Sequence, residues 1–91
     1  MAQGQTTVDF GTGKTDVSVN ITGQTAINSG FSLVEAWVFP NTTANNTADN
    51  HWVEDLEVGA GNVLDGIGFT IYVKCNTLLA HGIYNIAWVW V

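Results

Sequence analysis

The stretch "GIYNIAWVWV", residues 82–91, is apolar on both of its faces if it forms a β-strand. Successive side chains of a strand point to opposite sides of the sheet. One face then carries Ile83, Asn85, Ala87, Val89 and Val91, and the other carries Tyr84, Ile86, Trp88 and Trp90. A strand that is apolar on both sides has to be covered on both sides. The stretch therefore predicts a strand with the core on one face and a further covering layer on the other.

Two coverings fit this pattern. In the first, a symmetric oligomer covers the second face, because apolar area left in water costs about 25 cal/mol per Å². We assign that oligomer interface to the face formed by Tyr84, Ile86, Trp88 and Trp90. In the second, the strand lies in the middle of one sheet and the polar segment 41–50 folds over its second face.

Five more segments have the pattern of short strands. Val17, Val19 and Ile21 alternate with polar residues, which is the period of a half-buried strand. In "GIGFTIYVKC" (66–75), the residues on one face are Ile67, Phe69, Ile71, Val73 and Cys75. The others are "TTVDF" (6–10), "SLVEAWVFP" (32–40) and "HWVEDLEV" (51–58), which are rich in β-branched and aromatic residues. No stretch of ten residues keeps a helical period, so we expect no helix.

These segments predict an all-β chain, a six-stranded antiparallel β-sandwich, with residues 1–91 forming a single domain. Glycines lie mainly between the segments, where turns are expected. We expect residues 1–5 to form a flexible arm and residues 41–50 to form a long polar loop.

Charge excludes two classes of partner. The chain has eight acidic residues and only two basic ones, Lys14 and Lys74, which gives a formal net charge of −6. Phosphate groups are bound by clustered Lys and Arg, so we expect no nucleic-acid partner. The same charge disfavours an anionic membrane surface, and no run of 18 apolar residues is present. The N-terminal segment lacks a basic region followed by an apolar run, so we expect no signal peptide.

The segment "TADNHWVEDLEV" (47–58) holds the candidate binding residues. Asp49, Asn50, His51 and Trp52 form a candidate contact for a partner protein or a glycan. An aromatic ring can stack on a sugar while polar groups bind its hydroxyls. The alternative is that Trp52 is a core residue in phase with Leu56 and Val58. The spacing of the carboxylates and His51 matches neither an EF-hand nor a zinc motif, so we predict a solvated acidic strand and no metal site.

Catalytic chemistry has little support in the sequence. There are two histidines and no Gly-x-Ser-x-Gly or Cys-His arrangement, and a domain of this size offers little cleft. We therefore expect no enzymatic activity and no cofactor. The single cysteine, Cys75, is in phase with the apolar face of its strand, and we interpret it as a small buried hydrophobic residue.

Several segments resemble a family of small virion structural proteins of tailed bacteriophages. The resemblance covers about Thr15 to Val91 and is most specific in "VEAWV" (34–38), "TADNHWVEDLEV" (47–58), "GFTIYV" (68–73) and "YNIAWVWV" (84–91). It implies a location on the particle surface, on the capsid or tail, with other virion proteins such as the major capsid protein as partners. Many members of that family are longer between "GFTIYV" and the last strand, where this chain has only "KCNTLLAHG" (74–82).

A weaker similarity links the chain to the H-type lectin domain, a six-stranded sandwich that trimerises. The shared features are the "GFTIYV" strand, a short loop and a last strand that contains "AWVW" (87–90). This similarity implies a homotrimer. Together the two resemblances predict capsid decoration or a head-fibre or spike base. The alternative is a tail-fibre or receptor-binding carbohydrate-binding module that recognises a host surface glycan.

Overall fold

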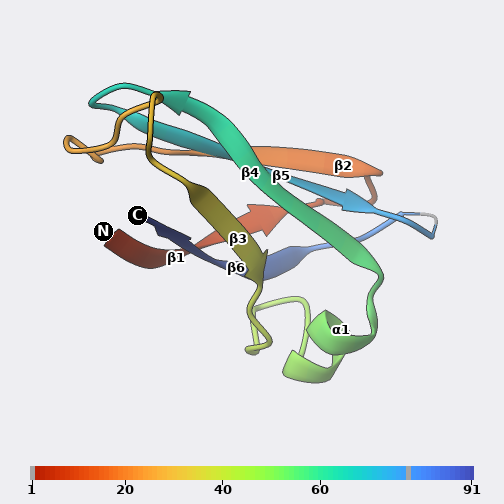
Figure 1. The fold of residues 1–91 in the computed structure, drawn as a ribbon. Helices are drawn as coiled ribbons and strands as arrows, with labels where there is room; N and C mark the ends of the chain where they lie inside the picture. Colours follow the sequence, from red (N-terminus) through yellow and green to blue (C-terminus); the bar gives the residue numbers. More distant parts are fainter. Residues whose placement is uncertain (1, 78) are drawn as a thin grey trace.

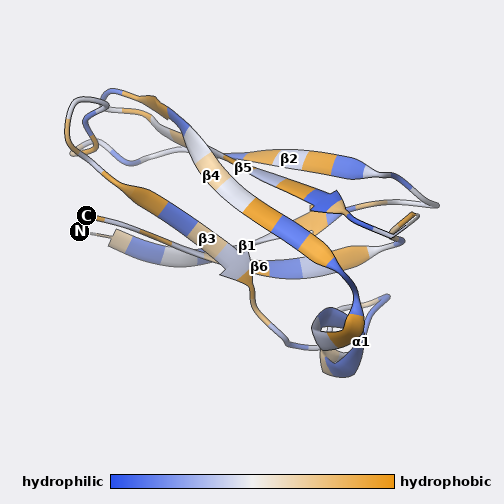
Figure 2. Ribbon diagram, turned by 45° about the vertical axis from the view of Figure 1, so that its right-hand side comes forward, coloured by the Kyte–Doolittle hydropathy of each residue, from blue (hydrophilic) through white to orange (hydrophobic). Residues whose placement is uncertain are grey.

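The computed structural model describes residues 2–77 and 79–91 and contains six strands and one short helix (Figure 1). The elements are β1 (Ala2–Asp9), β2 (Asp16–Ile21), β3 (Val34–Val38), α1 (Ala48–Val53), β4 (Leu56–Leu64), β5 (Gly68–Cys75) and β6 (Ile83–Trp90). The prediction of an all-β chain with six strands is confirmed. Figure 2 shows hydrophilic and hydrophobic residues alternating along β4, as expected where one face of a strand is buried.

The strands form two three-stranded sheets, with the orders β1-β6-β3 and β2-β5-β4. Every pairing between neighbours is antiparallel. The strand with two apolar faces, β6, is central in its sheet, and β5 is central in the other. These two strands therefore have hydrogen-bonded neighbours on both edges, and the remaining four strands form the edges.

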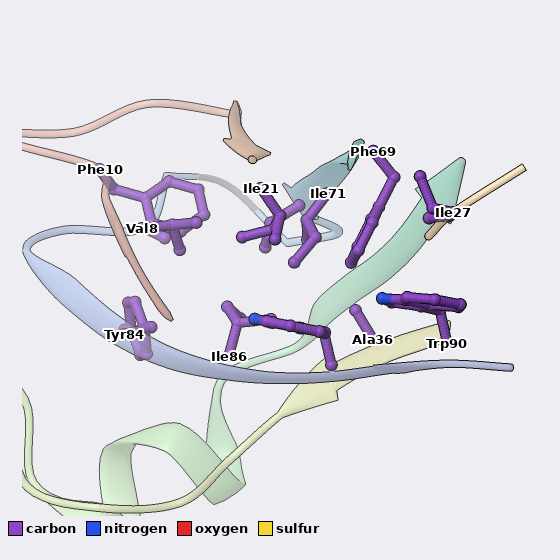
Figure 3. Packing of buried hydrophobic residues seen from close by; sticks show 13 residues of the cluster. Val8, Phe10, Ile21, Ile27, Ala36, Phe69, Ile71, Tyr84, Ile86 and Trp90 are labelled. Atoms are coloured by element: carbon purple, nitrogen blue, oxygen red, sulfur yellow. The ribbon is translucent and has the colours of Figure 1, made fainter. Parts of the chain in front are cut away.

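The inner faces of the two sheets contribute side chains to one hydrophobic cluster. Figure 3 shows Ile86 and Trp90 pointing from β6 toward Ile71 and Phe69. Ile86 and Ile71 are completely buried, and burial of such side chains contributes about 1.5–3 kcal/mol each. The Phe69 and Trp88 rings meet edge to face, with centroids 5.5 Å apart. Of the face predicted for 66–75, Phe69, Ile71 and Val73 are buried, but Ile67 lies before β5 and is exposed.

The prediction of a flexible arm at residues 1–5 is wrong for the residues described. Residues 2–5 belong to β1 and pair with β6, beginning with Ala2 opposite Trp90. The physical reason is that β6 has a second edge to satisfy after β3 has taken the first. Gly4 makes this pairing possible, because an added Cβ would lie 2.5 Å from the Trp88 ring.

The predicted strand 51–58 is wrong in its first half, and the predicted loop 41–50 is three residues too long. Residues 48–53 form α1, and β4 begins only at Leu56. Thr47 caps the helix: its Oγ1 accepts from the Asn50 amide, and the Asn50 Oδ1 accepts from the Thr47 amide. This capping box satisfies amides at the helix start and favours a helical turn over the extended conformation that Trp52 and Val53 suggested.

Candidate functional site

The four residues assigned to an oligomer interface lie inside the chain. Tyr84, Ile86, Trp88 and Trp90 are all less than 9% exposed and belong to the intramolecular cluster. The indole Nε1 of Trp90 donates a 2.9 Å hydrogen bond to Oε1 of Gln24, so the polar atom of this ring is also satisfied. The assignment of this face to a subunit contact is therefore wrong. The larger side chains lie inside because they remove more apolar area from water.

The outer face of β6 and the neighbouring residues of β3 form a second apolar surface, on the side opposite the core. Ala87 lies opposite Trp37 of β3, and Phe39 continues beyond the end of β3. Trp37 lies on the edge strand β3 and is 43% exposed, so a large part of its indole is in contact with solvent. We call this surface the outer apolar stripe; it consists of Leu33, Trp37, Phe39, Ala87, Val89 and Val91.

The outer apolar stripe is uneven rather than flat. A hollow of about 300 Å³ lies over Ala87, between Trp37 and the side chains of Gln3 and Gln5 on β1. At the other end, Leu33 and Val91 exchange two backbone hydrogen bonds of 3.0 Å and remain 71% and 58% exposed. The stripe therefore combines large exposed apolar groups with a depression beside them.

The segment 41–47 is hydrogen-bonded to β6, but these bonds do not place it over the outer apolar stripe. The Asn46 Nδ2 and the Thr43 Oγ1 both donate to the carbonyl oxygen of Ile83, at 3.0 and 2.8 Å. The Asn85 Nδ2 donates to the carbonyl oxygen of Asn41 at 2.9 Å. These bonds attach the segment to the first residues of β6, away from Ala87 and Val89. The hydrogen bonds therefore do not support the alternative in which the segment 41–50 covers the second face of the strand.

The candidate contact formed by Asp49, Asn50, His51 and Trp52 is divided between structural and exposed residues. Asn50 is part of the capping box, and His51 is 3% exposed. The Nδ1 of His51 lies 2.8 Å from the Thr47 carbonyl oxygen, and its Nε2 accepts from the Asn85 amide at 2.9 Å. Trp52 is 81% exposed, and Asp49 and Asn50 are also exposed, although Asn50 is engaged in the capping box. The alternative that Trp52 is a core residue is wrong, because the helix turns it outward.

Tyr84 joins the helix to the core. Its ring meets His51 at a centroid distance of 4.9 Å and Phe10 at 5.8 Å, both edge to face. Burial raises the pKa of the Tyr84 hydroxyl, and the nearby Glu54 carboxylate and Cys75 add to the increase. The Tyr84 ring therefore packs between α1 and the core.

The acidic residues near α1 have different partners. Glu57 forms a 3.2 Å ion pair with Lys74, while Asp55 accepts a long hydrogen bond from the Asn76 side chain. Among residues 2–77 and 79–91, no three His, Cys, Asp or Glu side chains gather as a metal site would require.

Cys75 is half-buried against the core, and its thiol lies 3.2 Å from the Glu54 Oε1. Within the same described ranges, no helix is long and apolar enough to cross a membrane.

Sequence reasoning missed three exposed aromatic residues among those described, Phe31, Trp37 and Tyr72. Trp37 was part of a predicted strand, and strict alternation with Ala36 could have placed it outside. Tyr72 lies in β5, between the buried Ile71 and Val73, and is 49% exposed on the outer face of the second sheet. The alternation of "FTIYV" (69–73) carries that signal, because Tyr72 falls in the polar phase with Thr70 and Lys74.

No protein-family model, no curated protein and no solved structure matches this chain. The resemblances to phage virion proteins and to the H-type lectin domain therefore remain predictions.

Proposed function

We propose that the protein is a non-enzymatic structural component of a bacteriophage particle, a β-sandwich that assembles into a homotrimer on the particle exterior. The outer apolar stripe is the observation that supports this proposal. It lies on the face of β1-β6-β3 opposite the core, so it is available to a second copy. Exposed apolar surfaces of this kind, bordered by polar residues, are typical of protein interfaces.

A second copy of the chain is the occupant that the charge distribution favours. The chain carries a formal charge of −6, so two copies repel one another over most orientations. Along the stripe the neighbouring side chains are largely uncharged, with Gln3 and Gln5 on β1 and Glu35 as the carboxylate between Leu33 and Trp37. Copies that meet here bring few like charges together and bury an indole from each chain.

Two of the four segments that carry the phage resemblance most specifically supply this face. "VEAWV" contains Trp37 and forms β3, and "YNIAWVWV" contains Ala87 and Val89 and forms most of β6. These strands are neighbours in register, with Glu35 opposite Val89. The resemblance and the exposed apolar surface thus coincide, which supports a particle component that acts through contacts. Capsid decoration or a head-fibre or spike base fits this role.

Analytical ultracentrifugation over a range of concentrations tests the assembly. The wild-type protein should sediment as a trimer, and Trp37→Glu should sediment as a smaller species with an unchanged circular dichroism spectrum. Trp52→Glu places the same charge on the exposed helix and should leave the trimer intact. A wild-type monomer at micromolar concentration would remove the proposal.

The location is tested separately on assembled particles. A reconstruction by electron cryo-microscopy should show density for the chain on the particle exterior. Copies spread over the capsomers would identify decoration, and a few copies at vertices would identify a fibre or spike base. Absence of the chain from purified particles would contradict the virion role even if the trimer forms.

A further inference from the structure

The outer face of β2-β5-β4 contains a groove centred on Tyr72. In register, Tyr72 has Ser18 of β2 on one side and Gly59 of β4 on the other. Neither neighbour is large enough to cover the ring, which leaves a hollow of about 470 Å³ beside it. We call this hollow the Tyr72 groove; it is lined by Asp16, Ser18, Glu57, Gly59, Tyr72 and Lys74.

The groove is open on the β4 side because Gly59 and Gly61 have no side chains. A Cβ added at Gly59 would meet no atom within 4 Å, and the same holds for Gly61. Glycine weakens a strand interior, and it is common where a ligand or another backbone approaches closely. No neighbouring atom of this chain would clash with a Cβ at either position. The effect of the two glycines is therefore to leave open space over β4.

Tyr72 is held on a rigid support. Its neighbours Ile71 and Val73 are both buried to 1% exposure or less, and β5 is paired along both edges. A ring displayed from such a strand loses little conformational freedom when a ligand binds. The groove is therefore already formed in the free protein.

Polar groups continue along β5 on both sides of the ring. At one end, Lys74 pairs with Glu57 at 3.2 Å and lies opposite Asp16 in register. At the other end, the Thr70 hydroxyl donates to the Asn20 Oδ1 at 3.0 Å. Thr70 is buried, so the hydrogen-bonding groups that the groove offers beside the ring are those of Asp16, Ser18, Glu57 and Lys74.

We propose that the Tyr72 groove binds a neutral saccharide, with one sugar ring packed against Tyr72 and its hydroxyls on the polar side chains that line the groove, Asp16, Ser18, Glu57 and Lys74. The volume lies within the range of small-ligand sites, about 300–1,000 Å³. A sugar ring has C–H groups for the aromatic ring and hydroxyls that both donate and accept. These match the Lys74 ammonium, the Glu57 carboxylate and the Ser18 hydroxyl.

Other ligand classes fit the groove less well. Two carboxylates face one ammonium in it, so an anionic sugar or a nucleotide would meet net negative charge. A wholly apolar ligand would strip water from charged groups without giving them partners. A neutral polyhydroxyl ligand avoids both costs.

The test is a glycan array with neutral hexose, N-acetylhexosamine and sialylated oligosaccharides, followed by calorimetric titration of the strongest binder. The wild-type protein should bind neutral glycans. Tyr72→Ala and Gly59→Leu should each weaken binding about tenfold or more, which corresponds to about 1.4 kcal/mol. A Cβ at position 59 meets no atom within 4 Å, so Gly59→Leu should project into the groove and block it, and a circular dichroism spectrum like that of the wild type confirms that the variant is folded.

Trp52→Ala is the matched control, because Trp52 is the more exposed aromatic residue and lies on α1. It should leave glycan binding unchanged. The proposal is overturned if no glycan binds, if binding survives both groove substitutions, if only sialylated glycans bind, or if Trp52→Ala abolishes binding. Sedimentation of Tyr72→Ala should still show the wild-type oligomer, so failure of this site is distinguishable from failure of the proposed assembly.

Discussion

The Nε2 atom of His51 accepts a 2.9 Å hydrogen bond from the backbone amide of Asn85. β3 ends at Val38, opposite Ile86, so the sheet supplies no further strand residue for that amide. The other ring nitrogen, Nδ1, donates to the Thr47 carbonyl oxygen at 2.8 Å. A single imidazole therefore continues the edge of the sheet and fixes α1 against β6.

Replacing His51 with Ala should destabilise the fold by about 2–4 kcal/mol. The change leaves the Asn85 amide without its partner, removes the side-chain hydrogen bond to the Thr47 carbonyl, and removes the ring that packs on Tyr84. Urea unfolding at fixed protein concentration measures the loss. Trp52→Ala, on the adjacent exposed residue, should change stability by less than about 0.5 kcal/mol. An equally small effect at His51 would mean that the helix is not docked in solution.

Gly4→Ala should destabilise the fold by about 1–3 kcal/mol, because its methyl group would overlap the Trp88 ring in a packed core. The control is Gly59→Ala, where the new methyl group meets no atom within 4 Å. Thermal unfolding of both variants under one condition compares them. Equal melting temperatures would show that the Ala2–Asp9 strand is not held against β6 as described.

Stability should fall at alkaline pH because of Tyr84. Its pKa is raised above the ordinary value of 10.0 in the folded state, so its stabilising contribution is fully present below pH 10. The contribution is lost as pH rises through the folded-state pKa, since the unfolded chain ionises first. Tyr84→Phe should flatten this alkaline decline in melting temperature. If the decline is equally steep in both proteins, another group causes it.

The alternation of apolar residues predicted six strands and much of the core, although the predicted strand 51–58 overlaps α1 and β1 begins earlier than predicted. Phe69, Ile71 and Val73 all lie on the buried face that their spacing indicates. The same reasoning could not choose between the two faces of β6, because both are apolar from Ile86 onward. That choice depends on which strands flank β6 and on Gly4, whose missing side chain admits the Trp88 ring.

The candidate contact was misplaced for a local reason. "NHWV" (50–53) has the aromatic and β-branched residues of a strand, but Thr47 and Asn50 form a capping box that starts a helix. The capping box rule prefers Glu or Gln where this chain has Asn50, so the signal was weak. The Tyr72 groove depends on pairing Tyr72 with Gly59 and Ser18, which are distant in sequence, and no local pattern reveals that pairing.

The two faces of the first sheet should respond differently to loss of an indole. Trp88→Ala removes a ring that is 8% exposed in the core, so it should lower the free energy of unfolding by about 3–5 kcal/mol. Trp37→Ala removes a ring that is 43% exposed on the outer apolar stripe. It should weaken self-association more than it weakens the fold of one chain.

Urea unfolding at several protein concentrations separates these effects, because the stability of an oligomer rises with concentration and that of a monomer does not. In Trp37→Ala the concentration dependence should shrink, whereas in Trp88→Ala it should persist at lower overall stability. The reverse pattern would place the subunit contact on the face with Trp88 and would require the core described here to open.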